Sequence, residues 1–68
     1  MQAWHLRELV FADPFRPFKV TIAAGRAFYV VNDPKTVRFR GDVMVLRDGD
    51  VDVWINPGLI AIIEVYPA

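Results

Sequence analysis

Few side chains of this 68-residue chain could carry out covalent chemistry. Serine and cysteine are absent from the sequence, which excludes serine and cysteine nucleophiles, disulfides and thiolate metal sites. His5 is the only histidine, and a single histidine does not form a zinc site unaided. We therefore expect a protein that is not an enzyme, with no catalytic residue, no cofactor and no bound metal.

One acidic segment has the spacing of the start of a calcium-binding loop. Asp48, Asp50 and Asp52 stand at alternate positions, as the first ligands of such a loop do. The rest of the pattern fails, because Val53 replaces the required glycine and Leu59 replaces the required glutamate. We interpret the segment as a solvated Asp-Gly hairpin turn.

The remaining candidates are residues for surface binding. Arg38 and Arg40 share one face of a predicted strand, Lys35 lies just before it, and Tyr29 and Trp54 are expected to point outward. An exposed aromatic ring beside arginine can stack on a nucleobase. The candidates for binding nucleic acid are therefore Tyr29, Lys35, Arg38 and Arg40. The alternative is that Tyr29 and Trp54 are buried in a contact between subunits, where aromatic residues and arginine are also enriched.

Composition favours self-association over DNA binding. The eight basic and eight acidic residues give a net charge of zero, whereas a dedicated DNA-binding domain more often has a basic excess. A chain this short buries a small core, and here 54% of the residues are hydrophobic. The first ten residues lack the apolar run of a secretory signal, and no run is long enough to span a bilayer, so we expect a cytoplasmic protein without a membrane partner.

The elements that position these residues begin with a short helix over residues 2–12. Its apolar side chains Ala3, Leu6, Leu9 and Val10 recur at helical spacing. Asp13-Pro14 ends the helix, because the residue before proline is disfavoured in helical conformation. The segment Pro14–Phe18 follows, and we interpret it as an extended clasp that its phenylalanines pin to the core.

Short strands separated by turns fill residues 18–66. Phe18, Val20 and Ile22 alternate toward one face, and Phe28 and Val30 do so in the next strand. Turn signals occur at residues 24–25, 41–42 and 48–50. These patterns predict a mainly β single domain over residues 1–68, a five-stranded antiparallel SH3-like barrel after the helix. Counting the interruption at residues 32–34 as a break gives six strands.

The closing stretch suggests a neighbouring chain. After the break at residues 56–58, the last strand has Glu64 as its only charged residue, so both of its faces are apolar. Strands of that kind are usually buried on both sides. One short chain has little material to cover both faces, so we expect a homo-oligomer. The candidate interface residues are Trp54, Ile60, Ile62 and Tyr66.

Two resemblances follow from these residues. The chain resembles a group of short uncharacterised bacterial proteins that share a Pro-Phe-Arg-Pro-Phe motif, here Pro14–Phe18, together with Gly25-Arg26 and Ile63-Glu64. That resemblance implies no activity. The order of helix and strands also resembles the Sm/Hfq family of barrels.

The Sm/Hfq resemblance implies rings in which the fourth and fifth strands of neighbouring protomers pair, and binding of single-stranded RNA. Residues 20–26 stand where that family has its first hairpin, and residues 53–55 where it has its fourth strand. The lysine-histidine pair that lines the uridine pocket is replaced by Asn56-Pro57, and the base-stacking glutamine-phenylalanine is missing near Asp42-Val43. No RNA-binding residue therefore carries over.

Two functions remain open from the sequence. The first is an oligomeric Sm/Hfq-like module that binds single-stranded RNA, with the chain itself as its other partner. The alternative is a homo-oligomeric protein-interaction or scaffold module with no nucleic-acid ligand.

Overall fold

The computed structural model describes residues 2–31 and 36–67, except for the side chain of Ala3. This part of the chain contains one α-helix, one 3-10 helix and six strands. They are α1 (Ala3–Val10), β1 (Phe18–Ile22), β2 (Ala27–Val30), β3 (Val37–Arg40), β4 (Val43–Asp48), β5 (Val51–Ile55), η1 (Pro57–Leu59) and β6 (Ile60–Val65). The predicted helix is confirmed, with bounds slightly inside residues 2–12.

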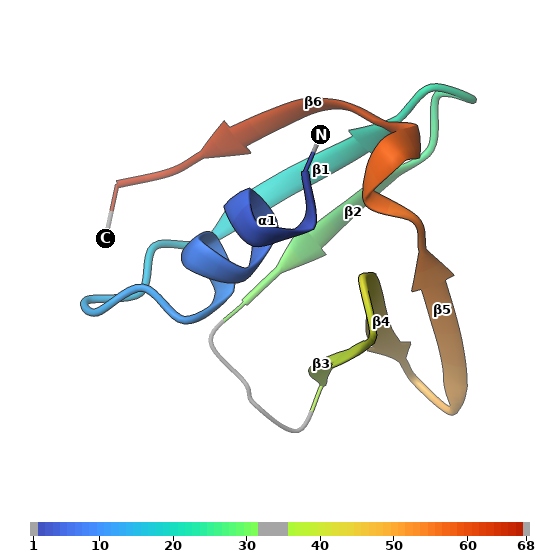
Figure 1. The fold of residues 1–68 in the computed structure, drawn as a ribbon, viewed down its shortest axis with the longest axis horizontal. Helices are drawn as coiled ribbons and strands as arrows, with labels where there is room; N and C mark the ends of the chain where they lie inside the picture. The colour runs from blue at the N-terminus through green and yellow to red at the C-terminus, as the bar shows by residue number, and fades with distance from the viewer. Residues whose placement is uncertain (1, 32–35, 68) are drawn as a thin grey trace.

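The strands form two antiparallel three-stranded sheets, in the orders β2-β1-β6 and β3-β4-β5 (Figure 1). The mainly β fold with a short N-terminal helix is thus confirmed. The five-stranded SH3-like barrel is not confirmed, because the described residues form six strands, as in the alternative count, and no ladder joins the two sheets within them. β2 ends at Val30 and β3 begins at Val37, in the other sheet. The predicted interruption at residues 32–34 lies outside the described residues.

The core lies between the two sheets, where the inward-facing positions of the strands meet. Phe18 and Val20 of β1 have no exposed surface, and neither does Met44 of β4. Burying side chains of this size is the main favourable contribution to folding in so small a domain. The buried core cluster comprises Leu6, Phe18, Val20, Val30, Val37, Met44, Leu46, Ile55 and Ile60.

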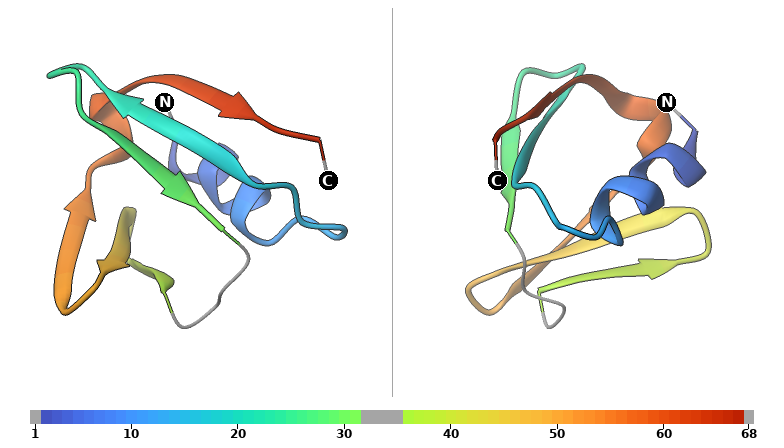
Figure 2. Two further views of the ribbon diagram at one scale, coloured as in Figure 1. Left: turned by 180° about the vertical axis from the view of Figure 1, so that it is seen from behind. Right: turned by 90° about the vertical axis from the view of Figure 1, so that its left-hand side faces the viewer.

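Helix α1 joins the core through one fully buried side chain, that of Leu6. Leu9 and Val10 pack against the same cluster and are half-buried. In Figure 2 the helix lies across the space between the two sheets, on the side of η1. No helix within the described part of the chain is long and apolar enough to cross a membrane.

The segment between α1 and β1 contacts the end of the chain. Phe15 packs on the core, with its ring centroid 6.2 Å from that of Phe18. The Tyr66 amide donates to the Pro17 carbonyl at 2.8 Å, and the Arg16 Nε donates to the Tyr66 carbonyl at 3.1 Å. Residues 15–17 therefore hold the chain just after β6, in keeping with the clasp interpretation.

A β-bulge changes which residues of β6 face the core. Val20 pairs with Ile63 and Thr21 with Ile62, but Ile22 pairs with Ile60, so the register shifts by one residue at Ala61. An extra residue in one strand reverses the alternation beyond it. Ile60 and Ile63 therefore both face inward, although they are three residues apart.

Candidate functional site

The outer edges of β5 and β6 are open. Within the described residues, β5 pairs only with β4 and β6 pairs only with β1, so each strand has one edge without a ladder partner. Exposed apolar side chains accompany these edges. They are Val51 (58% exposed), Trp54 (58%), Leu59 (57%), Ile62 (53%) and Val65 (36%).

The predicted interface residues divide between surface and core. Trp54 and Ile62 are exposed, and Tyr66 is half-buried. The prediction that Ile60 lies at the interface is corrected, because Ile60 is 8% exposed and belongs to the core of its own chain. The bulge at Ala61 is the reason, because it turns Ile60 inward and leaves Ile62 pointing outward.

The outer face of the β2-β1-β6 sheet carries Lys19, Tyr29, Glu64 and Tyr66, here called the tyrosine face. Lys19 pairs with Tyr29 on one side and with Glu64 on the other. Its Nζ lies 3.4 Å from the Glu64 Oε1 and 5.7 Å from the centroid of the Tyr29 ring. The hydrogen bond to Glu64, with the attraction of the same carboxylate, raises the pKa of Lys19 above its ordinary value.

The two tyrosine rings of this face stack on each other, with centroids 6.4 Å apart. Reduced hydration of the Tyr66 hydroxyl raises the pKa of Tyr66, and the neighbouring Lys19 opposes that change. Tyr66 therefore remains a neutral phenol at physiological pH. The tyrosine face therefore presents two stacked aromatic rings beside the Lys19–Glu64 ion pair.

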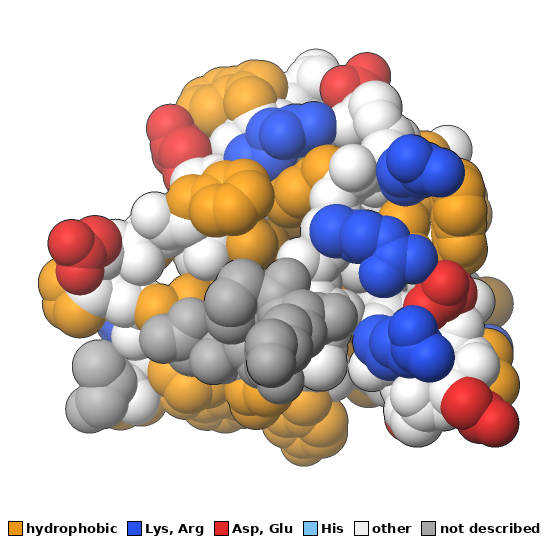
Figure 3. Space-filling model, turned by 90° about the horizontal axis from the view of Figure 1, so that it is seen from below, with side chains coloured by type: hydrophobic (Ala, Val, Ile, Leu, Met, Phe, Trp, Pro, Cys, Tyr) orange, Lys and Arg blue, Asp and Glu red, His pale blue; other side chains and the backbone are white. Residues whose placement is uncertain are grey.

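The outer face of the β3-β4-β5 sheet carries Arg38, Arg40, Arg47 and Trp54, here called the arginine–tryptophan face. Arg38, Val45 and Trp54 lie in one row across the three strands. Val45 has no exposed surface although it lies outside the core cluster, so side chains of this face cover it. Seen from below, basic side chains gather beside hydrophobic ones on this side of the molecule (Figure 3).

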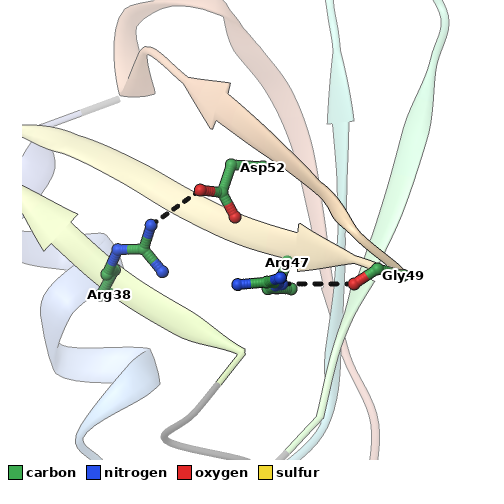
Figure 4. A network of polar contacts seen from close by, with 4 residues as sticks. All are labelled: Arg38, Arg47, Gly49 and Asp52. Atoms are coloured by element: carbon green, nitrogen blue, oxygen red, sulfur yellow. Dashed lines mark hydrogen bonds and ion pairs between the residues drawn. The ribbon is translucent and has the colours of Figure 1, made fainter.

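Two of these arginines are held by contacts within the sheet. An Arg38 terminal nitrogen lies 2.9 Å from Asp52 Oδ2, and the Arg47 Nε donates to the Gly49 carbonyl at 3.3 Å (Figure 4). The Arg40 side chain makes no hydrogen bond or ion pair within residues 2–31 and 36–67. The face therefore keeps a positive charge that Asp52 only partly offsets.

The predicted nucleic-acid residues do not form one cluster. Tyr29 lies on the tyrosine face, whereas Arg38 and Arg40 lie on the other sheet, and Lys35 lies outside the described residues. The aromatic residue that shares a face with the arginines is Trp54, which sequence reasoning placed in a subunit contact. The Asp-Gly turn predicted at residues 48–50 fixes the β4–β5 register and so sets Trp54 opposite Val45, but the pairing of β3 with β4, which brings Arg38 into the same row, was not predicted.

A cavity of 370 Å³ opens between β2 and the start of β3. Its apolar lining includes Phe28, Val37 and Leu46, and the exposed Arg47 and Asp48 also border it. Within the described residues, no cluster of three histidine, cysteine, aspartate or glutamate side chains could hold a metal ion.

Comparison with known proteins finds no match for this chain among protein-family models, curated proteins or solved structures.

Proposed function

We propose that this protein is a non-enzymatic β module that assembles with copies of itself, the outer edge of β5 pairing with the β6 edge of the next copy. The supporting observation is that neither edge has a partner strand in the described part of the chain and that both lie beside exposed apolar side chains, among them Trp54 and Ile62. An open edge offers unpaired backbone N–H and C=O groups to another strand.

The composition of the two strands supports this pairing. Edge strands that avoid association usually carry lysine or proline, and neither residue occurs within β5 or β6. Joining two different edges is a heterologous contact, which closes into a ring when the rotation between subunits permits. The Sm/Hfq resemblance implies an assembly of this kind. We propose that this resemblance is genuine and that the protein is cytoplasmic.

Native mass measurement of the full chain tests the assembly. The expected mass is a fixed multiple of the 7.8 kDa chain. Ile62→Asp should reduce that mass to a single chain while circular dichroism stays unchanged, because Ile62 points away from the core. Val31→Asp is the matched control, since Val31 is equally exposed but lies beyond β2. A monomeric wild-type protein at every concentration would contradict the proposal.

A second candidate function is binding of single-stranded RNA on the arginine–tryptophan face. It is favoured by Trp54, 58% exposed, on the same outer face as Arg38 and Arg40. Aromatic rings stack on bases without strong sequence preference, and arginine contributes phosphate contacts.

Fluorescence anisotropy with short U-rich and A-rich oligonucleotides tests this candidate. Binding should weaken as salt rises from about 50 mM to about 200 mM. Trp54→Ala and Arg40→Gln should each weaken it, whereas Arg26→Gln, on the first hairpin, serves as the control. Salt-independent binding, or equal loss in the control, would rule out this face.

A further inference from the structure

The cavity of 370 Å³ coincides with a third open edge, that of β2. Within the described residues, β2 pairs only with β1, through Phe18–Val30, Lys19–Tyr29, Val20–Phe28 and Thr21–Ala27. Ala27, Tyr29 and Val31 also border the cavity, so the free edge of the strand forms one of its walls.

The preceding turn determines which backbone groups of β2 point to that wall. Ile22 N donates to Arg26 O and Gly25 N donates to Ile22 O, each at 2.9 Å, which closes the hairpin. Hydrogen-bonded and non-hydrogen-bonded pairs alternate along an antiparallel ladder. Counting from this turn, the N–H and C=O groups of Ala27 and Tyr29 point away from β1, toward the cavity.

The opposite side of the cavity is apolar and ends in charge. Val37 and Leu46 are buried core residues, and Phe28 is half-buried beside them. Arg47 borders the cavity, and its Nε donates to the Gly49 carbonyl in the turn after β4. Asp48 also borders the cavity, and the Arg26 guanidinium lies 4.9 Å from the centroid of the Phe28 ring.

We propose that this cavity and the β2 edge together bind an extended peptide segment of a partner protein. The segment adds a strand to β2 and places one bulky apolar side chain in the cavity and a carboxylate next to Arg47. Free backbone groups beside an apolar pocket are the requirements for recognition by strand addition. The volume is at the lower end of the roughly 300–1,000 Å³ of ligand pockets, which suits one side chain.

Charge favours an acidic residue in the peptide. Among the described residues, Arg47 and Asp48 border the cavity, and the Arg26 guanidinium lies over the ring of Phe28, which also lines it. Interactions of this kind at an interface rim mainly determine which partner binds. The proposal goes beyond self-assembly, because it uses an edge that the β5–β6 contact leaves open.

The probe is the fluorescein-labelled peptide Thr-Val-Thr-Phe-Glu-Val-Thr, capped at both ends and titrated with the full-length protein. Saturable binding is expected. Ala27→Pro should weaken it about tenfold or more, because proline removes an outward-pointing N–H without removing a bond to β1. Ala27→Thr keeps that N–H and should bind like the wild type.

The second variant reverses the charge of Arg47, and it tests the proposal without the folding defect that proline could cause. Arg47→Glu should lower affinity for the probe and raise affinity for the peptide in which lysine replaces glutamate. Backbone NMR shifts upon addition of the probe should be largest in residues 27–31.

Three results would overturn the proposal. They are absence of binding to the wild type, equal binding to the Ala27→Pro and Ala27→Thr proteins, and loss of binding in Ile62→Asp but not in Ala27→Pro. Light scattering on the same samples distinguishes a loss of peptide binding from a loss of self-assembly, because Ala27→Pro should leave the mass of the assembly unchanged.

Discussion

Lys19 links all three strands of its sheet through one side chain. It forms an ion pair with Glu64 of β6 and lies over the ring of Tyr29 of β2. The Lys19 side chain is only 23% exposed, whereas that of Glu64 is 48% exposed. Lys19 therefore connects the three strands through contacts that need its positive charge.

The stability of the fold should decrease in alkaline solution for this reason. The raised pKa of Lys19 means that its charged form is favoured by folding, so its contribution is fully present below the ordinary value of 10.5 and is lost as pH rises through the raised value. The raised pKa of Tyr66 acts in the same direction above its ordinary value of 10.0. Urea midpoints at about pH 8 and about pH 11 measure the effect.

Lys19→Met should reduce this alkaline loss, because it removes the group that deprotonates. Glu64→Gln should reduce it as well, since it removes the partner that raises the pKa of Lys19. If the urea midpoint of both variants falls between about pH 8 and about pH 11 as much as that of the wild type, the ion pair does not contribute to the alkaline loss of stability.

At the scale of elements, the bulge in β6 determines which isoleucines serve the core and which remain at the surface. Ile60 is 8% exposed and Ile62 is 53% exposed, although regular alternation would give them the same face. The strand therefore presents isoleucine on both faces: Ile60 packs in the core and Ile62 is exposed to solvent.

The two positions should respond differently to truncation. Ile60→Ala should cost about 2–5 kcal/mol of folding free energy, because it leaves a cavity in the core. Ile62→Ala should cost far less in a sample dilute enough to be monomeric. Chemical denaturation of both variants under those conditions measures the difference, and equal losses would contradict the position of the bulge.

Helix α1 depends on its docking, because eight residues form a marginal helix in isolation. Leu6 supplies its fully buried contact. Leu6→Ala should therefore cost about 2–5 kcal/mol and reduce helical circular dichroism. Glu8→Ala, an exposed position on the same helix, is the control and should leave the helix intact. Loss of helical signal in both variants would contradict the idea that docking through Leu6 stabilises the helix.

The sequence predicted these elements better than it predicted their surroundings. Alternation at Phe18, Val20 and Val30 correctly placed them in the core, because an antiparallel strand with one wet face repeats every two residues. The position of Ile60 could not be read this way, since a bulge depends on the partner strand. The separation of Tyr29 from Arg38 likewise depends on which sheet each strand joins, and that is a tertiary property.

For the whole molecule, two sheets with several open edges leave much apolar surface in contact with water. Trp54, Leu59 and Ile62 are each more than half exposed. Surface of this kind usually marks a contact with another protein.

The proposed assembly makes thermal stability depend on concentration. Anything that binds only the folded state raises the melting temperature by mass action. Between about 10 µM and about 1 mM chain, the wild type should therefore melt at increasing temperatures. The melting temperature of Ile62→Asp should stay constant. Differential scanning calorimetry makes the comparison, and a constant wild-type value would count against assembly.

The short η1 helix has a consequence for the size of such an assembly. Together with Asn56 it connects β5 to β6, Pro57 within it is buried, and the Asn56 side chain accepts a hydrogen bond from Gly58 N at 2.9 Å. If the two edges pair between copies, the direction that this short connection gives to β6 relative to β5 determines the angle through which each subunit is rotated against the next. The number of subunits in a closed assembly is then encoded in this connection, and inserting one residue there should change the curvature and yield particles of a different size.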